Sequence, residues 1–152
     1  MAKKKIDPLN KKQYSAVSAM LTVSDIPAAV SFYQKAFGFS KRAIMNGPDG
    51  KPIHAELTLR GTTLMLGPEN EAMGKRTAKT VGASPASLFI YVENVDKVVE
   101  KGTKLGATSQ GPVMDMSITV PQRSPQNISI TGPWLVAPSF VPFSTTLSTF
   151  ST

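Results

Sequence analysis

The fold is decided by residues 21–38, which read LTVSDIPAAVSFYQKAFG. Residues 15–23 are rich in β-forming side chains and predict a strand. Ser24-Asp25 then offers a helix N-cap, and apolar residues recur behind it at three- and four-residue spacing. Because Gly38 supplies a C-terminal stop, the stretch predicts a strand followed by an amphipathic helix.

The same order of signals returns at residues 90–106, which read IYVENVDKVVEKGTKLG. Asn94 takes the capping position of Asp25, and Gly106 takes the stop position of Gly38. Since strand, cap, apolar stripe and stop recur in one order, the sequence predicts an internal repeat of one β-α unit.

Three more strands are predicted between the two helices, over residues 39–46, 53–60 and 62–67. The turn sequence Asn46-Gly47-Pro48-Asp49-Gly50 joins the first two, and Arg60-Gly61 is a tight hairpin signal between the next two. The first half of the chain therefore has the order β-α-β-β-β.

A chain of 152 residues buries one hydrophobic core, so we expect a single domain over residues 15–152. The predicted parts are a basic flexible tail at 1–14, a first module at 15–69, a connection at 70–86, a second module at 87–123 and an atypical uncharged segment at 124–152.

The last of these segments differs in composition from the rest of the chain. No charged residue follows Arg123, and the segment is rich in proline, serine and threonine. Prolines are poor residues for interior strands, so we expect the second module to be degenerate after about residue 116, with strand surviving in 127–131 or 134–137. We hypothesise that a change of reading frame or a fusion replaced the original end. Nucleotide sequencing that finds no domain-like ending in the other frames would contradict this.

Composition excludes several kinds of site. The chain has no cysteine, which rules out disulfides, thiolate metal sites and cysteine nucleophiles. Its single histidine, His54, cannot form a multi-histidine metal site within one chain. No apolar run reaches the roughly 18 residues of a membrane span and no signal peptide is recognisable, so we expect a soluble, cytoplasmic protein without a membrane partner.

The net charge of +7 is concentrated near the N-terminus, where residues 1–12 hold five lysines and one aspartate. A lysine run without aromatic residues is typical of a solvated tail, so a nucleic-acid partner is not the leading expectation. The alternative, a nucleic-acid binder acting through this tail, predicts a salt-dependent affinity that disappears when residues 1–12 are removed.

Three segments resemble the vicinal oxygen chelate superfamily of glyoxalases, bleomycin-resistance proteins and dioxygenases: SDIPAAVSFYQKAFGF at 24–39, IHAEL at 53–57 and SLFIYVENVD at 87–96. The last two are most similar to its PhnB-like branch, and the resemblance covers about residues 15–116. It implies an α+β fold in which two βαβββ modules form a cupped mixed sheet with helices outside. It also implies a homodimer.

The resemblance further implies where a metal would bind. Metal-dependent members carry one ligand on the first strand of each module and a carboxylate on each last strand. The first-strand positions fall on Ser18 and Ser87, one carboxylate position falls near Met65, and the other is not recognisable in the C-terminal segment. Serine hydroxyls bind divalent transition metals far more weakly than imidazole or carboxylate does, so no metal or other cofactor is predicted.

Strand alternation separates the side chains that pack under the helices from those on the opposite face. The aliphatic set is expected beneath the helices: Ala19, Leu21, Val23, Leu88, Ile90 and Val92. By resemblance, Met20, Met65, Phe89 and Tyr91 then line the cup, which suits a flat or apolar small molecule. The alternative is that these four residues fill a closed core.

His54 and Glu56 lie two residues apart on a predicted strand and therefore share a face, with Arg60 further along it. A histidine beside a carboxylate suits acid–base chemistry, and these two residues are the candidates for a catalytic role. The alternatives are a polar sheet face wetted by solvent, or a metal pair completed by a second subunit.

These observations favour a metal-independent protein that binds a small apolar or aromatic molecule, with Met20, His54, Glu56, Met65, Phe89 and Tyr91 around the ligand. The alternative is a lyase or dioxygenase of the same superfamily. It would use a Zn, Ni, Mn or Fe ion bound by His54 and Glu56 across a dimer.

Overall fold

The structure is a computed structural model that describes residues 14–82, 87–109, 112–113, 115–118, 128–131, 134–136 and 144–148. Within them the helices are α1 (Ile26–Phe37), α2 (Ala78–Val81) and α3 (Val95–Lys104), with a short 3-10 turn, η1 (Glu71–Met73). The strands are β1 (Ala19–Thr22), β2 (Ser40–Asn46), β3 (Pro52–Leu59), β4 (Thr62–Gly67), β5 (Ser87–Tyr91), β6 (Thr108–Ser109), β7 (Asp115–Ile118), β8 (Ile128–Thr131), β9 (Trp134–Val136) and β10 (Ser144–Ser148).

The first module is a four-stranded mixed sheet in the order β1-β4-β3-β2, in which β1 and β4 are parallel and the other pairs are antiparallel. The Asp25 side chain accepts a hydrogen bond of 2.8 Å from the Ala28 N–H and so caps α1. Gly38 ends the helix in the left-handed region at φ 77°. The predicted helix is therefore confirmed, whereas the first strand is shorter than residues 15–23.

The second module repeats this topology in the order β5-β10-β9-β6, with β5 and β10 parallel. The Asn94 side chain caps α3, and Gly106 follows the helix with φ 93°. The internal repeat is confirmed. The sheet is reduced at its far edge, because β6 has 2 residues and β9 has 3, against 7 and 8 for β2 and β3.

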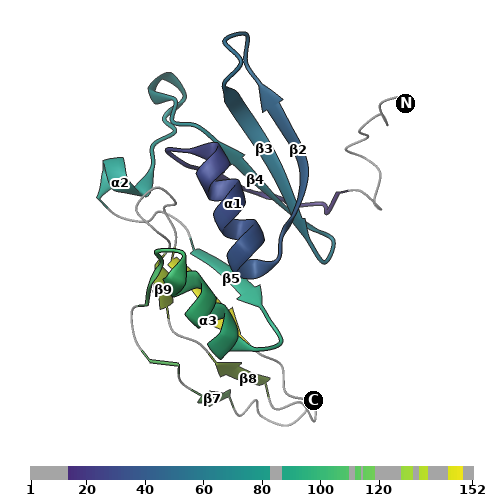
Figure 1. Ribbon diagram of the computed structural model, residues 1–152, viewed down its shortest axis with the longest axis vertical. Coiled ribbons are helices and arrows are strands. Elements are labelled where there is room, and N and C mark those ends of the chain that lie inside the picture. The colour runs from purple at the N-terminus through teal and green to yellow at the C-terminus, as the bar shows by residue number, and fades with distance from the viewer. Residues whose placement is uncertain are drawn as a thin grey trace.

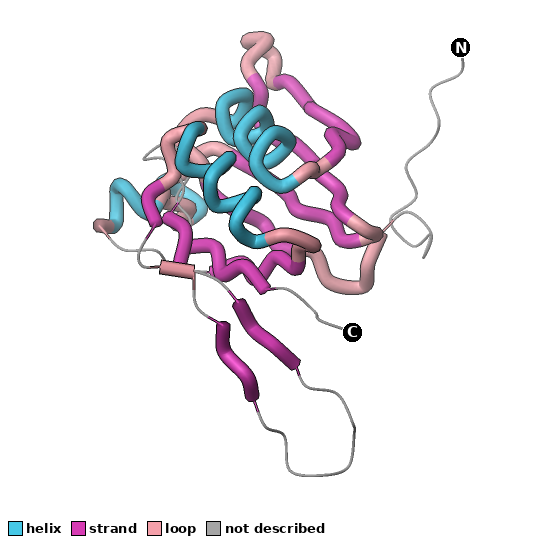
Figure 2. Tube along the Cα trace, turned by 60° about the horizontal axis from the view of Figure 1, so that its bottom comes forward, coloured by secondary structure: helices cyan, strands magenta, loops and turns pink. Residues whose placement is uncertain are grey.

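The C-terminal strands agree in part with the sequence analysis. β8 and β9 fall within the two windows in which strand was expected to survive, whereas β10 was not predicted. Its sequence STTLS has no clean apolar alternation, and its place in the sheet comes from pairing with β5 and β9. β7 and β8 form a separate two-stranded hairpin that extends away from the two larger sheets (Figure 2).

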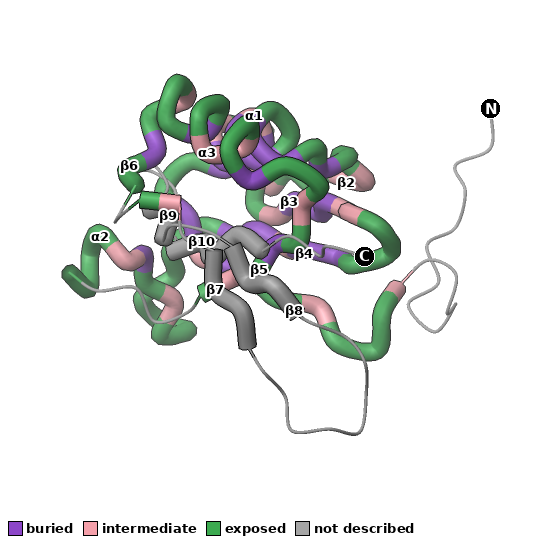
Figure 3. Tube along the Cα trace, turned by 90° about the horizontal axis from the view of Figure 1, so that it is seen from below, coloured by how far each residue is buried: buried purple, intermediate pink, exposed green. Residues whose placement is uncertain are grey.

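The two long helices lie next to each other on one side of the sheets (Figures 1 and 3). α1 covers the first sheet, and its Phe32, Tyr33 and Phe37 form a ring cluster with Phe39, which follows the helix; the closest ring centroids are 5.6 Å apart. Ile90, Val95 and Ala107 of the second module belong to the same buried cluster. One core therefore spans both modules.

The connection between the modules is more regular than its sequence suggested. The Asn70 and Thr77 side chains accept hydrogen bonds from the Met73 and Thr80 amides, and these caps start η1 and α2. The rest of the predicted connection, residues 83–86, lies outside the described residues, as do residues 1–13 of the predicted tail. Among the described helices, none has the length and apolar character to cross a membrane.

Candidate functional site

His54 and Glu56 lie beside each other on β3. Side chains alternate along this strand, so both residues face away from Ala55 and Leu57, which are fully buried. The Nε2 atom of His54 is 3.5 Å from Glu56 Oε1, and the two side chains are 17% and 10% exposed. The predicted pair is formed, and it is largely shielded from solvent rather than wetted by it.

Three residues that the sequence did not point to join this pair. The hydroxyl of Tyr14 donates a hydrogen bond of 2.7 Å to Glu56 Oε2, and the Arg42 guanidinium lies 4.5 Å from the centre of the Tyr14 ring. Arg42 Nη1 also donates to Thr63 Oγ1 at 2.9 Å. These five residues, Tyr14, Arg42, His54, Glu56 and Thr63, are called the polar cluster below.

Tyr14 is the last residue of the predicted tail, and it contacts the first sheet through its hydrogen bond to Glu56. Desolvation raises the pKa of the Tyr14 phenol, the hydrogen bond to the Glu56 carboxylate and its charge raise it further, and Arg42 lowers it. The phenol thus remains the proton donor to Glu56. Arg42 lies at a β-bulge between Lys41 and Ala43. A bulge interrupts the alternation of side chains along a strand, so the face on which Arg42 lies does not follow from the sequence.

The predicted methionines lie on the same face as the pair. Met20 of β1 is in register with Met65 of β4, and Met65 is in register with Glu56 of β3. A side chain at Gly67 would come within 2.8 Å of the Met20 Cε atom, so the Met20 methyl group lies over Gly67. The structure therefore brings four of the six predicted ligand residues onto one face of the first sheet.

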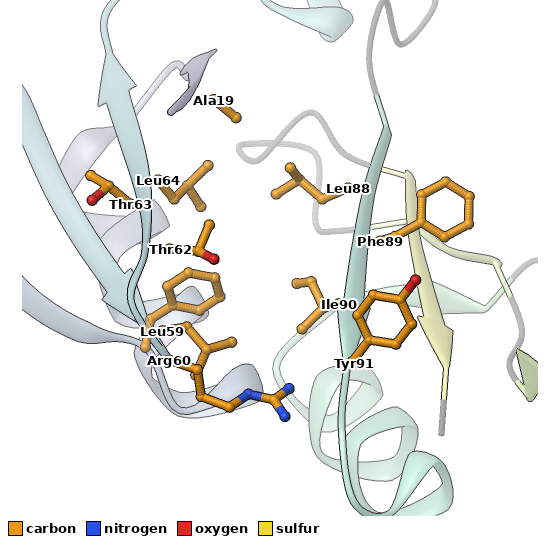
Figure 4. Close-up of a pocket in the computed structure, with 11 residues that line it drawn as sticks. Ala19, Leu59, Arg60, Thr62, Thr63, Leu64, Leu88, Phe89, Ile90 and Tyr91 are labelled. Carbon is orange, nitrogen blue, oxygen red and sulfur yellow. The ribbon is translucent and has the colours of Figure 1, made fainter. Parts of the chain in front are cut away.

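A cavity of about 390 Å³ lies between the two modules (Figure 4), and Thr63 of the polar cluster is also one of its lining residues. We call it the inter-module cavity. It is lined by Ala19, Phe39, Leu59, Arg60, Thr62, Thr63, Leu64, Leu88, Phe89, Ile90 and Tyr91. Leu88 and Ile90 point from β5 toward Leu64 and Thr62 across the cavity, whereas Phe89 and Tyr91 point to the other side of β5. Residues of both sheets thus contribute to its walls.

The six predicted ligand residues are therefore divided between two places. Phe89 and Tyr91 are among the lining residues of the inter-module cavity, although their side chains point to the other side of β5, and Met20, His54, Glu56 and Met65 are not among its lining residues. The closed-core alternative is wrong for Met20, Phe89 and Tyr91, which are 46%, 57% and 43% exposed. The expectation that the aliphatic set packs beneath the helices holds for most of its members, because Ile90 is buried and Leu88 and Val92 pack against the core. It does not hold for Ala19, which is exposed and lines the cavity.

Arg60 is a cavity residue that the sequence analysis placed differently. Arg60 and Gly61 form the two-residue turn between β3 and β4, and both have positive φ, 46° and 82°. Alternation along β3 ends at this turn, so the expectation that Arg60 shares a face with His54 and Glu56 does not hold. Its side chain extends toward β5 at the rim of the cavity (Figure 4).

The residues at the superfamily's metal positions do not suit a metal within one chain. Ser18 directly precedes β1 and Ser87 is the first residue of β5, and neither serine has a strong ligand atom for a transition metal. Within the part of the chain that the structure describes, no three His, Cys, Asp or Glu side chains gather closely enough to hold a metal ion.

Two repeated βαβββ units, each with parallel first and last strands and a helix on the same side, define a duplicated α+β fold. The family model for the Glyoxalase/Bleomycin resistance protein/Dioxygenase superfamily matches residues 15–120. The chain belongs to this superfamily. The match ends near residue 116, where the sequence resemblance was expected to end.

Individual relatives support the same assignment. The uncharacterized proteins Rv0887c of Mycobacterium tuberculosis and Mb0911c of Mycobacterium bovis are each 38% identical over 96 residues, or 61% of this chain. The chain covers only 56% and 63% of the lengths of these relatives.

Solved structures share the fold. A gene product from Arabidopsis thaliana is similar with a TM-score of 0.60 at 17% identity, over 89% of this chain and 98% of that one. A glyoxalase/bleomycin resistance protein/dioxygenase family enzyme from Burkholderia phytofirmans is similar with a TM-score of 0.57 at 16% identity, over 93% and 99% of the two chains.

Proposed function

We propose that this protein binds a small apolar or aromatic molecule in the inter-module cavity and that binding needs no metal. The observation that carries the proposal is a cavity of about 390 Å³ whose walls are mostly aliphatic and aromatic. Small-molecule sites have volumes of roughly 300–1,000 Å³ and are lined mainly by apolar side chains with a few polar groups. The cavity fits the lower end of that range, which suits a ligand of one or two rings.

Binding in this cavity would link the two modules, because β4 supplies one wall and β5 supplies the other. Each Å² of apolar ligand surface removed from water contributes about 25 cal/mol. A ligand held between Leu64 and Ile90 would therefore stabilise the pairing of the modules as well as each module itself.

A pair of adjacent substitutions on β1 tests the location. Ala19 lines the cavity, whereas Met20 lies on the opposite face of the strand. In a thermal-shift screen with a panel of aromatic compounds, we expect a binding compound to raise the melting temperature of the wild type and of Met20→Phe. Ala19→Phe fills the cavity and should abolish the shift. The reverse pattern would place the ligand on the Met20 face, as the sequence analysis predicted.

A second candidate function is favoured by the His54–Glu56 pair. We propose as the alternative a metal-dependent lyase or dioxygenase in which two subunits each contribute this pair. Stabilisation by Zn, Ni, Mn or Fe(II) that is lost in both His54→Ala and Glu56→Ala would support it. Unchanged melting temperatures with all four metals would contradict it.

The finer properties follow from resemblance and are proposals. We propose a homodimer, for which the exposed Met20, Phe89 and Tyr91 offer apolar surface, and light scattering on a sizing column gives the mass directly. We also propose membership of the PhnB-like branch and a cytoplasmic location. A monomer at micromolar concentration would contradict the dimer.

A further inference from the structure

Among the described residues that line the inter-module cavity, Arg60 is the one that carries a charge. The other lining residues are alanine, phenylalanine, leucine, isoleucine, threonine and tyrosine, so none of them carries a carboxylate that could neutralise Arg60. Within the described residues, no ion pair or hydrogen bond engages the Arg60 side chain. A cation beside apolar walls favours a ligand that combines an apolar body with a negative group.

The backbone at Arg60 gives a second, independent observation. A two-residue hairpin with positive φ at both positions favours Asn, Asp or Gly at the first of them, because a larger side chain crowds the left-handed backbone. Arg60 is the one non-glycine residue with positive φ among the described residues. A residue held against its local preference at the rim of a cavity indicates a role for its side chain beyond the turn.

We propose that the ligand of the inter-module cavity is an apolar carboxylic acid whose carboxylate is bound by Arg60. This inference rests on the proposed function and specifies its ligand class. The planar guanidinium donates two parallel hydrogen bonds to a carboxylate, which a neutral group does not match. Thr62, at the start of β4 in the same lining, offers a further hydroxyl, and the apolar body of the acid lies between Leu64 and Leu88.

The test compares 2-naphthoate with its neutral isostere 2-naphthamide by calorimetric titration of the full chain. The two probes share an apolar body, so the ratio of their affinities isolates the contribution of the charge. We expect the wild type to bind the acid about tenfold more tightly than the amide at low salt, because the Arg60 guanidinium forms a charged, partly exposed hydrogen bond with the carboxylate. Added salt should reduce this ratio.

Arg60→Asn is the decisive variant because it separates binding from folding. Asparagine suits the left-handed turn, so the melting temperature of the free protein should rise by about 2 °C. The preference for the acid should nevertheless disappear, because the loss of affinity falls mainly on the acid. The matched control is Lys51→Gln, which removes a positive charge at the turn between β2 and β3 and should leave the preference intact.

Each remaining outcome has a definite meaning. Equal affinities of acid and amide in the wild type, with both lost in Ala19→Phe, would overturn the acid proposal and leave the cavity as the site of an uncharged ligand. If Arg60→Asn and Lys51→Gln reduce the preference for the acid equally, the overall positive charge of the protein explains the preference, and the proposal that Arg60 binds the carboxylate is overturned. If neither probe binds the wild type, the acid proposal fails together with binding of ring compounds in this cavity.

Discussion

At the scale of single residues, the carboxylate of Glu56 is the most demanding group on the first sheet. The residue is 8% exposed, and burying a charge is costly unless the charge is paired and hydrogen-bonded. His54 and Tyr14 each contact one of its oxygens, and Arg42 lies against the Tyr14 ring. The polar cluster therefore satisfies a carboxylate that would otherwise destabilise the sheet.

Tyr14→Phe tests this role of the cluster. The substitution keeps the ring beside Arg42 but removes the hydroxyl that donates to Glu56. We expect a loss of about 1 kcal/mol in the free energy of unfolding, measured by urea denaturation. When Glu56 is already replaced by glutamine, the further substitution Tyr14→Phe should lower the free energy of unfolding by less than it does in the wild type. An unchanged stability in Tyr14→Phe would show that the hydrogen bond contributes nothing.

The opposite effect is expected at Tyr33. This side chain of α1 is fully buried, and its hydroxyl has no hydrogen-bond partner among the residues that the structure describes. Burial raises the pKa of its phenol far above the ordinary value, so the group stays neutral. Tyr33→Phe removes an unsatisfied polar group without changing the shape of the ring and should stabilise the protein by about 1 kcal/mol. Destabilisation in the same urea titration would contradict this.

At the scale of elements, side-chain caps decide where the helices begin. Asp25 and Asn94 start the two long helices at equivalent positions of the repeat. Asn70 and Thr77 cap η1 and α2 in the connection. The Glu69 carboxylate there accepts hydrogen bonds from the Thr77 N–H and the Thr80 hydroxyl. A four-residue helix such as α2 has little stability of its own, so it depends on these caps.

The connection should therefore be sensitive to acid. The hydrogen bond from the Thr77 N–H, followed by that from Thr80, lowers the pKa of Glu69 below its ordinary value of 4.5. A lowered folded-state pKa stabilises the structure at pH above the ordinary value, and this stabilisation is lost as the pH falls through the folded-state value. We expect the Thr77 amide to lose protection from hydrogen exchange at low pH. In Glu69→Gln this pH dependence should be absent, and its persistence there would exclude Glu69 as the cause.

At the scale of the whole molecule, the buried cluster joins the two modules into one unit. Ile90, Val95 and Ala107 belong to the same apolar cluster as the residues under α1, and α1 contacts α3. Because no boundary divides this core, neither sheet can lose its cover without exposing apolar surface of the other.

The molecule should consequently unfold in one cooperative step. The single histidine, His54, reports on the first module by NMR, and the single tryptophan, Trp134 in β9, reports on the second by fluorescence. We expect both probes to give the same urea midpoint. Val95→Ala should lower the free energy of unfolding by about 2 kcal/mol, so both midpoints should fall together. Val17→Ala, at a position 83% exposed, should change neither. Two separate midpoints would show that the modules unfold independently.

The sequence by itself determined the two long helices, the strands β2, β3 and β4 of the first module and the internal repeat. Caps, apolar periodicity and stop glycines act within a few residues, so α1, α3 and the repeat could be read from local patterns such as Asp25 and Gly38. The closeness of His54 and Glu56 followed for the same reason, because two residues that are two apart on a strand must share a face.

Only the tertiary structure decided which of these residues meet across the chain. Tyr14 and Glu56 are 42 positions apart, and their hydrogen bond depends on how the segment before β1 crosses the sheet. The inter-module cavity depends on the distance between β4 and β5, and the position of Arg60 depends on a left-handed turn that redirects its side chain. Such contacts arise from the packing of distant elements, which no local pattern of one sequence encodes.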